Sequence, residues 1–471
     1  MNTISQPSDP SAVFLKSSVR SVTYHELHCF AASMLQNVHD PSRPVGLLTT
    51  DRQKAILLIA SAWINGITIV PLPATSSNPE LADQIKRSGI HTLFCDASHM
   101  NFIKLPDVKF VSIDKVNSSP GPSSPAVCDD EQLFGIFFTS GSTGKPKAVP
   151  LKRRQLVSAA RSVSVLTRLN TGEQWLHCLP LNHVGGVSVV LRSLLYGSGI
   201  YCATDFGIPH LAEIMSRNRD VKAVSLVPTQ LTRLLGYPGF FPHNDFRFAL
   251  IGGGWISEMV KSKAVGVLPV IYSFGMTESC AMIVAGVAGK STPAGSTGRI
   301  LPPNILTIRD ESGNEIPNGQ TGLICLKGPQ IFDGYLDDDT DPFFDGGWFN
   351  TGDYGYADND GFLFMEARRE DRIVTGGENV DPREIESVLA AIPGIREAAV
   401  IGIPDEEWGQ LVTAVVVTGS TDNITLKSVR NILKGQLSDY KIPRRLEVVD
   451  SLPKTALGKV KKGDLMARFT V

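Results

Sequence analysis

The stretch Phe137 to Val149, FFTSGSTGKPKAV, is the part of the chain whose residue types most clearly suggest chemistry. An apolar run is followed by hydroxyl side chains, two glycines and two lysines. Backbone N–H groups of such a loop can converge on an anion, hydroxyls can donate to it, and lysines can balance its charge. The stretch therefore predicts a phosphate site.

This loop is not a Walker A sequence, because Lys145 is followed by Pro146 where that motif requires Ser or Thr. A simple P-loop hydrolase is therefore disfavoured. The alternative to a phosphate site is a solvated Gly/Ser turn that closes a hairpin. The coincidence of hydroxyls, glycines and lysines favours phosphate.

The composition sets the class of protein and of partner. The chain has 471 residues, of which 42% are hydrophobic and 20% are charged, and its formal net charge is −2. Single hydrophobic cores stop growing at about 250–300 residues, so we expect two or more domains. The charge balance provides no basic surface for nucleic acid or an anionic membrane, so we expect small-molecule substrates. Whether the protein forms a homo-oligomer is left open by the sequence.

Cysteine usage and the apolar stretches bear on the compartment. Seven scattered cysteines without a CxxC pair are typical of a reducing compartment, not of structural zinc or a disulfide framework. The N-terminus lacks the pattern of a signal peptide, so we expect a cytoplasmic protein. The apolar stretch that begins at Ala55 is interrupted at Asn65-Gly66 and ends at Pro71. It predicts a buried helix turning into a buried strand rather than a membrane span.

Short apolar strands alternate with helix-length segments, which predicts an α/β fold with mostly parallel sheets. Predicted strands are 67–71, 91–95, 108–112, 223–227, 248–252 and 270–272. Ligands of such folds bind beyond the carboxyl ends of strands. The phosphate loop, Gly252 to Trp255 and Tyr272 to Ser279 each follow a strand, so we expect all three to face one cleft.

The second half of the chain has a different residue pattern. Residues 295–364 are turn-rich, with hairpin signals at 310–314 and 358–361, and predict a small β subdomain. The charged stretch 366–372 has the composition of a hinge, although a solvated turn is equally common. The rest predicts a compact α+β domain whose first helix has Asp381 as N-cap and Pro382 at its first position.

Six motifs occur in the order used by the adenylate-forming acyl-CoA synthetase superfamily: TSGSTGKPK, PLNHVGG, YSFGMTES, TGD, ARREDRIVTGGENVDPREIE and PKTALGK. The chain resembles that superfamily over nearly its whole length. The resemblance implies that a carboxylate attacks the α-phosphate of ATP, giving an acyl-adenylate and pyrophosphate, and that the thiol of coenzyme A then displaces AMP. It also implies an N-terminal domain at 1–368 that binds ATP and the acid, and a mobile C-terminal lid at 369–471.

The same resemblance implies the residues that bind ATP. The β and γ phosphates would be held by Thr139, Ser140, Gly141, Ser142, Thr143, Gly144 and Lys145. The nucleoside would contact Gly252, Gly253, Gly254, Tyr272, Gly275, Met276, Asp353 and Arg368, with Asp353 and Arg368 on the ribose hydroxyls. Thr277 would donate to the α-phosphate, Glu278 would ligate Mg²⁺, and Lys459 would reach in from the lid to neutralise charge between the carboxylate and the α-phosphate.

Members of the superfamily rotate the C-terminal domain between the two half-reactions. The hinge would be Glu370. Gly376 and Gly377 would line the tunnel for the pantetheine arm, because only backbone without side chains leaves room for it.

Arg192 lies among aliphatic residues in a predicted helix at 187–197, where an unpaired buried guanidinium is costly. Ser188 lies one turn earlier on the same face, which points back toward His183. Arg192 therefore predicts an anionic partner. That partner is either a carboxylate of the protein or a second carboxylate on the substrate.

The stretches PLNHVGGVSVVLRSLLYG and SLVPTQLTRLL resemble the o-succinylbenzoate–CoA ligase branch, which acts in menaquinone and phylloquinone biosynthesis. In that branch an arginine nine residues after the motif histidine contacts the carboxylate that is not activated, and Arg192 follows His183 by nine. The resemblance implies that the succinyl carboxylate reacts with ATP while the benzoate meets Arg192. His183 would gate the acyl pocket or pack against the ring, and Thr229 would line the pocket.

Three other functions stay open. The chain could be a CoA ligase for another aromatic or aliphatic acid, a stand-alone adenylation protein that loads a carrier protein, or a nucleotide-binding sensor without activity. The combination of Lys459, Glu278 and Asp353 disfavours the sensor.

Overall fold

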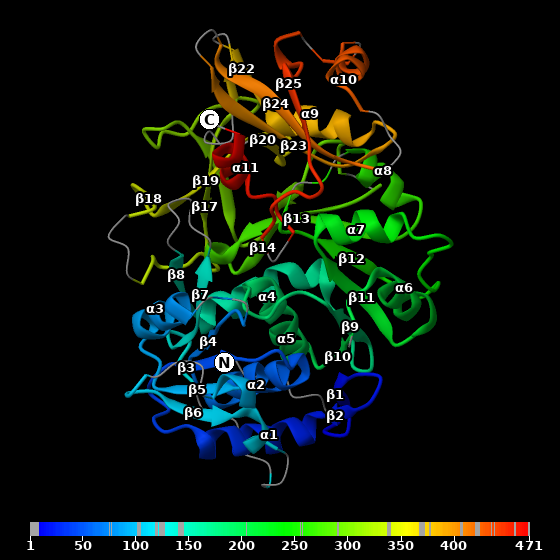
Figure 1. Ribbon diagram of the computed structural model, residues 1–471. Helices are drawn as coiled ribbons and strands as arrows, with labels where there is room; N and C mark the ends of the chain where they lie inside the picture. The colour runs from blue at the N-terminus through cyan, green and yellow to red at the C-terminus, as the bar shows by residue number, and fades with distance from the viewer. Residues whose placement is uncertain are drawn as a thin grey trace.

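A computed structural model of the protein describes residues 9–74, 76, 78–100, 105–117, 121, 128–139, 146–203, 205–254, 256, 258–289, 292–336, 341–366, 373–375, 378–405, 408–419, 424–434, 436–437, 439–455 and 458–469. The described residues form three sheets covered by helices (Figure 1). The C-terminal segment, orange to red, lies at the top of that view, above α7 (Pro228–Leu235) and β13 (Val270–Met276). The predicted α/β class is confirmed.

The six-stranded sheet holds the strands on either side of the predicted phosphate loop. Its order is β6-β5-β3-β4-β7-β8, parallel except for the last pair. Its strands are β3 (Val45–Leu48), β4 (Ile69–Pro71), β5 (Thr92–Cys95), β6 (Lys109–Ser112), β7 (Leu133–Thr139) and β8 (Lys147–Lys152). β7 and β8, the strands on either side of residues 140–145, pair in antiparallel orientation, as the alternative hairpin interpretation of that loop required.

The large sheet runs in the order β16-β17-β19-β20-β15-β14-β13-β12-β11-β9-β10-β1-β2, with β18 beside β19. Besides β13, its strands are β1 (Val13–Lys16), β2 (Ser21–Thr23), β9 (Gln174–His177), β10 (Gly199–Cys202), β11 (Val221–Leu226), β12 (Phe248–Ile251), β14 (Ala281–Val287), β15 (Gly298–Ile300), β16 (Ile305–Arg309), β17 (Gly322–Lys327), β18 (Phe343–Phe344), β19 (Trp348–Ala357) and β20 (Phe362–Glu366). The strands of the predicted β subdomain therefore continue the hydrogen-bonded ladder of the α/β sheet through β14 and β15.

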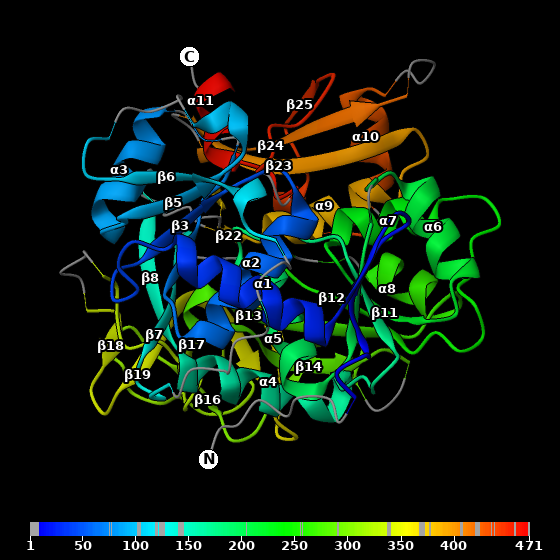
Figure 2. The same cartoon turned by 90° about the horizontal axis from the view of Figure 1, so that it is seen from below.

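Buried apolar residues of several helices pack into one core with strands of both sheets. The helices of the N-terminal part besides α7 are α1 (Tyr24–Asn37), α2 (Arg52–Asn65), α3 (Asn78–Ser88), α4 (Arg153–Thr167), α5 (Val184–Tyr196), α6 (Ile208–Arg217) and α8 (Glu258–Val265). In the view from below, α1 and α2 lie in the middle of the picture with β3, β5 and β6 on the left (Figure 2), and α2 packs against both α1 and α5. Residues Ala55 to Ile64 of α2 are all buried, and Gly66 ends the helix at a φ of 67° before β4. The predicted buried helix and strand are thus confirmed, and no helix among the described residues is long and apolar enough to cross a membrane.

The C-terminal part has its own sheet and core. Its strands are β21 (Ile373–Thr375), β22 (Glu378–Val380), β23 (Ile395–Asp405), β24 (Gly409–Thr418) and β25 (Arg445–Val448). Its helices are α9 (Pro382–Ala390), α10 (Leu426–Leu433) and α11 (Lys462–Phe469). Asp381 caps α9 as predicted, because its carboxylate accepts from the backbone N–H of Arg383 at 2.8 Å.

Candidate active site

A cavity of about 450 Å³ lies between the carboxyl ends of β12 and β13 and the C-terminal part of the chain. Many of the residues predicted for the nucleotide line it. These are Gly253, Gly254, Tyr272, Gly275, Met276, Asp353 and Lys459. Of the three segments expected to face one cleft, the one after β12 and the one in β13 both line this cavity, whereas residues 140–145 of the phosphate loop lie outside the described residues and their place stays a prediction.

The glycines of this cavity are needed for close backbone packing. A Cβ atom on Gly252 would lie 2.7 Å from the hydroxyl oxygen of Ser273, and Gly253 has a φ of 79°. A Cβ atom on Gly275 would overlap the carbonyl oxygen of Ala281 on the neighbouring strand. At Gly252 and Gly275 a side chain would push β13 away from its neighbouring segments. Because no side chain is present at these positions, a flat backbone surface is left for a ligand.

Tyr272 and Asp353 both line the cavity. The Tyr272 hydroxyl donates to the carbonyl of Lys261 at 3.2 Å, and burial raises the pKa of this phenol. Asp353 is half-buried in β19, and its backbone N–H donates to the hydroxyl of Thr351 at 3.1 Å. A carboxylate accepts hydrogen bonds only, so Asp353 can take two adjacent hydroxyls of a ribose.

Lys459 reaches the cavity from a tight turn near the C-terminus. The turn is closed by the Thr455 N–H, which donates to the carbonyl of Lys459 at 2.8 Å, and Gly458 has a φ of 78°. A Cβ atom on Gly458 would lie 2.9 Å from the hydroxyl oxygen of Thr229 at the start of α7. The turn therefore abuts the N-terminal part, and Lys459 and Asp353 line the same space. Thr229, predicted for the acyl pocket, lines this cavity as well.

Sequence reasoning missed several charged residues of the lining. Lys261, Arg383, Glu386 and Lys462 contribute to the cavity. Glu386 is paired with Lys462 at 2.7 Å and accepts from the N–H of Val400 at 2.8 Å, and burial raises the pKa of its carboxyl. Glu386 falls inside a motif, but nothing in its spacing marks it as a cavity residue.

Thr277 and Glu278 lie in η3 (Thr277–Ser279), a short 3₁₀ helix that joins β13 to β14. Glu278 is buried, and its Oε1 accepts from the Tyr335 hydroxyl at 3.0 Å. Cys280 and Ala281, which follow, have φ values of 55° and 79°. In the described part of the chain no three or more His, Cys, Asp or Glu residues form a metal-binding group. One hard carboxylate suits Mg²⁺, which takes most of its other ligands from water and substrate phosphates.

Arg192 lies beside a second, much smaller pocket. This pocket is bordered by α4, α5 and the start of β14, with Ser188, Cys280, Ala281 and Met282 among its residues. Arg192 is 6% exposed, and its guanidinium lies 4.7 Å over the ring of Trp175. The pocket is narrow, so a ligand ring requires side chains to move.

The hydrogen bonds of Arg192 leave part of the guanidinium without a partner. Its Nε donates to the Ser188 carbonyl at 3.0 Å, and its Nη2 donates to the Ser188 hydroxyl at 2.6 Å. Its Nη1 is buried and has no hydrogen-bond partner. Burial lowers the pKa of Arg192 to about 10. No carboxylate among the described residues forms an ion pair with Arg192, so the internal salt bridge is not observed there.

His183 is the N-cap residue of α5. His177 contacts the first turn of this helix at the carbonyl of Gly186. Arg52 can only donate, so the contact of its Nη1 with His177 Nδ1 at 3.0 Å makes Nδ1 the acceptor. Nε2 then carries the proton and donates to the Gly186 carbonyl at 3.1 Å. Burial, with the charge of Arg52, lowers the pKa of His177 to about 3. Burial also lowers the pKa of His183.

Of the predicted phosphate loop, Thr139 alone lies within the described residues. Thr139 ends β7 and pairs with Lys147 across the hairpin. The predicted residues Ser140, Gly141, Ser142, Thr143, Gly144, Lys145, Arg368, Glu370, Gly376 and Gly377 lie outside the described residues.

Comparison with known proteins identifies relatives over both parts of the chain. Residues 4–336 match the family described as AMP-binding enzyme, and residues 384–459 match the AMP-binding enzyme C-terminal domain. The 2-succinylbenzoate–CoA ligase of Enterococcus faecalis is 32% identical over 450 residues, which cover 94% of this chain and 92% of that protein. A Listeria monocytogenes protein of the same name is 38% identical over 73% of this chain and 71% of its own.

Two solved structures also match nearly the whole chain. The o-succinylbenzoate CoA synthetase of Bacillus subtilis, in complex with the acyl-adenylate OSB-AMP, superposes with a TM-score of 0.88 at 27% identity, covering 97% of this chain and 96% of that chain. ATP-bound MatB of Rhodopseudomonas palustris superposes with a TM-score of 0.90 at 27% identity, covering 98% and 97%.

Proposed function

The chain belongs to the AMP-binding enzyme family, and we propose that it is an AMP-forming ligase that converts 2-succinylbenzoate to 2-succinylbenzoyl-CoA. The substrates are ATP, coenzyme A and the diacid. The observation that carries the choice of acid is Arg192, a buried cation with a free Nη1 beside a pocket and no carboxylate among the described residues to neutralise it.

The first half-reaction joins the succinyl carboxylate to the α-phosphate of ATP with loss of pyrophosphate. Asp353 holds the ribose hydroxyls, while the backbone around Gly253 and Gly275 receives the base. Lys459 meets the negative charge that develops between carboxylate and phosphate, a role that requires its position in the same cavity as Asp353. Thr277 donates to the α-phosphate. Substitution at phosphorus depends mainly on such positioning and charge stabilisation.

The residues present fit a magnesium ion. Glu278 would hold it together with the phosphates of ATP, and the ion would neutralise phosphate charge when bound. Loop residues 140–145 would hold the β and γ phosphates between β7 and β8.

The second half-reaction requires the C-terminal domain to turn about Glu370, so that Lys459 leaves and the thiol of coenzyme A approaches past Gly376 and Gly377. The thiol attacks the acyl carbon and AMP leaves with the bonding electron pair. All seven cysteines of the chain are free, as an enzyme of a reducing compartment such as the cytoplasm requires.

Arg192 selects the acid in this proposal. Its Nη1 would donate to the benzoate carboxylate, and the cost of burying the cation would be recovered only when that anion is bound. His183, the N-cap residue of the same helix, would gate the acyl pocket or pack against the ring.

The test compares acids and variants. Thioester formation from ATP and coenzyme A is measured with 2-succinylbenzoate, benzoate, cinnamate and octanoate, on wild type and Arg192→Ala. We expect 2-succinylbenzoate to be the best acid and its kcat/KM to fall about 100-fold in the variant. If another acid is best and Arg192→Ala leaves it unchanged, the chain is a CoA ligase for that acid. Exchange of pyrophosphate without transfer to coenzyme A would instead favour a protein that loads a carrier.

A further inference from the structure

Tyr335 contacts two parts of the ATP site that are far apart in sequence. Its hydroxyl donates to Glu278 Oε1 at 3.0 Å, and the Nζ of Lys147 lies 4.3 Å from the centroid of its ring. Lys147 is the first residue of β8, directly after the predicted phosphate loop. One side chain therefore bridges the proposed metal ligand and the strand that carries the loop.

We propose that Tyr335 is a positioning residue for the Glu278 carboxylate, so that one oxygen is held by the tyrosine and the other is turned to the metal ion. The inference rests on the proposed role of Glu278. A hydrogen bond to a metal-ligating carboxylate fixes the orientation of that group, and loss of such partners commonly costs about 10–100-fold in metal affinity.

The backbone around Tyr335 is fixed on both sides to the elements that it bridges. The N–H of Phe332 donates to the carbonyl of Glu278 at 2.9 Å, and the N–H of Leu336 donates to the carbonyl of Ala148 at 2.9 Å. Phe332 also packs edge-on against the Tyr335 ring, with centroids 4.9 Å apart. The segment thus joins the turn of Glu278 to β8 independently of the tyrosine hydroxyl.

The buried amide of Gln330 adds a further connection to the Glu278 turn. Its Nε2 donates to the carbonyl of Ser279 at 2.7 Å and to the carbonyl of Met282 at 3.0 Å. Its Oε1 accepts from the hydroxyl of Ser162 at 2.9 Å. The turn and the segment before Tyr335 therefore form one hydrogen-bonded unit.

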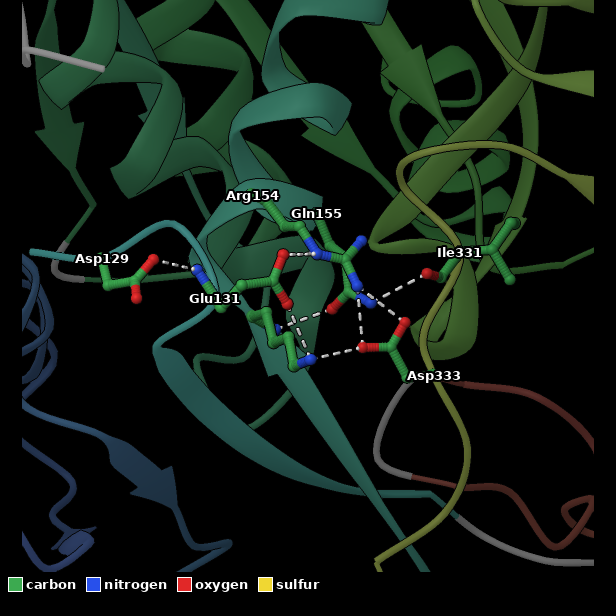
Figure 3. Close-up of polar contacts among 7 residues, drawn as sticks. Asp129, Glu131, Arg154, Gln155, Ile331 and Asp333 are labelled. Carbon is green, nitrogen blue, oxygen red and sulfur yellow. Dashed lines mark hydrogen bonds and ion pairs between the residues drawn. The ribbon is translucent and has the colours of Figure 1, made fainter. Parts of the chain in front are cut away.

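A ring of ion pairs anchors the other side of the segment to α4 and β8. Asp333 accepts two bonds of 2.8 Å from Arg154 and pairs with Lys152 at 2.9 Å. Both cations also pair with Glu131, at 2.7 Å from Arg154 and 2.9 Å from Lys152. Figure 3 shows Arg154 between the two carboxylates, with the Gln155 amide donating to the carbonyl of Ile331 at 2.9 Å. This fixed backbone holds the segment of Tyr335 in place when the tyrosine hydroxyl is removed.

The experiment measures ATP affinity by calorimetry with and without Mg²⁺, in the absence of acid so that no turnover occurs. The ratio of the two dissociation constants is the gain in affinity that the metal provides. We expect Tyr335→Phe to reduce this gain about tenfold while metal-free ATP affinity stays within about twofold. Tyr335→Leu also removes the ring beneath Lys147, so it should in addition weaken metal-free ATP binding by about threefold.

Two further variants separate positioning from general damage. In a Glu278→Gln background, Tyr335→Phe should cause no additional loss, because the hydroxyl acts through that carboxylate. Tyr354→Phe is the matched control, since it removes another tyrosine–glutamate bond, from Tyr354 to Glu311 Oε1 at 3.0 Å, and should leave the gain unchanged.

Three results would overturn the inference. The first is an unchanged metal-dependent gain in Tyr335→Phe, and the second is an equal loss of affinity with and without Mg²⁺. In the third, Glu278→Gln keeps the full gain, which refutes the metal role of Glu278 as well. The first two results leave that role intact, so the two failures are distinguishable.

Discussion

Gly275 and Met282 lie directly opposite each other in the antiparallel pair of β13 and β14, and they line different spaces. Gly275 faces the large cavity with Asp353 and Lys459, whereas Met282 borders the small pocket of Arg192. The strand pair is therefore a wall shared by the proposed ATP and acid sites. The turn that joins these two strands carries Glu278.

Gly275→Ala should damage both sites at once. The added Cβ would overlap the backbone carbonyl of Ala281, which cannot move aside like a flexible side chain. We expect a loss of unfolding free energy of about 3 kcal/mol and weaker binding of both ATP and the acid. Chemical denaturation and calorimetry check this. Gly463→Ala is the control, because a Cβ there meets nothing within 4 Å; normal ligand binding by Gly275→Ala would contradict the shared wall.

Arg192→Met should stabilise the fold while it removes selectivity. Replacement of a buried cation that lacks a carboxylate partner by an apolar chain of similar length should raise the free energy of unfolding by about 1–3 kcal/mol. Activity on 2-succinylbenzoate should fall, whereas slow activity on monocarboxylates should persist. Denaturation and thioester assays on the same preparations test this trade-off. A destabilised variant would mean that the contact with Trp175 outweighs the cost of burial.

The difference in unfolding free energy between Arg192→Met and wild type should change with pH in one direction. Burial lowers the pKa of Arg192 to about 10, so above that pH the unfolded chain holds a proton that the folded chain has released. The stability contribution of Arg192 therefore rises as the pH increases above about 10, where only the unfolded chain still holds this proton. The stability gap between Arg192→Met and wild type should be constant below about pH 9 and narrow above pH 10.

His177→Gln should make the protein less sensitive to acid. The pKa of His177 is lowered to about 3, so between its unfolded value of about 6.5 and pH 3 the unfolded chain binds one more proton. Wild-type stability should fall as pH falls through this window, by up to about 1.4 kcal/mol per pH unit from this residue. Gln can still donate to the Gly186 carbonyl without titrating. Denaturation at pH 4 and pH 7 measures the slope, and equal slopes in both proteins would exclude His177 as its source.

The sequence predicted those features that depend on local patterns. The α2 helix and β4 strand followed from the apolar run and Gly66, and Asp381 was recognised as an N-cap. The nucleotide residues were predicted from the resemblance to the acyl-CoA synthetase superfamily, and their roles stay predictions. Arg192 was identified because an arginine within an aliphatic helix must have a specific reason to be buried.

Contacts between distant segments could not be predicted in this way. Tyr335 meets Glu278 across 57 positions, and Lys462 meets Glu386 through the folding of the C-terminal domain. Residues 295–364 were predicted to form a small β subdomain, but hairpin signals describe only neighbours in sequence and do not show which edge of a sheet these strands extend. The pairing of β14 with β15, and of β15 with β20, depends on tertiary packing that no local pattern records.

Lys459→Ala and Gly377→Leu should separate the two half-reactions in opposite ways. In the proposed mechanism Lys459 acts on charge that develops at the α-phosphate, so its loss should slow pyrophosphate exchange by about 100-fold or more. It should leave thioester formation from a preformed acyl-adenylate nearly intact. Gly377→Leu should do the reverse, because a side chain would block the path of the thiol without touching the nucleotide. Both half-reactions are measured for each variant, with release of AMP from synthetic adenylate as the second readout. If both variants lose both activities equally, the C-terminal domain does not alternate between two roles, and a single arrangement of the two domains must serve both steps.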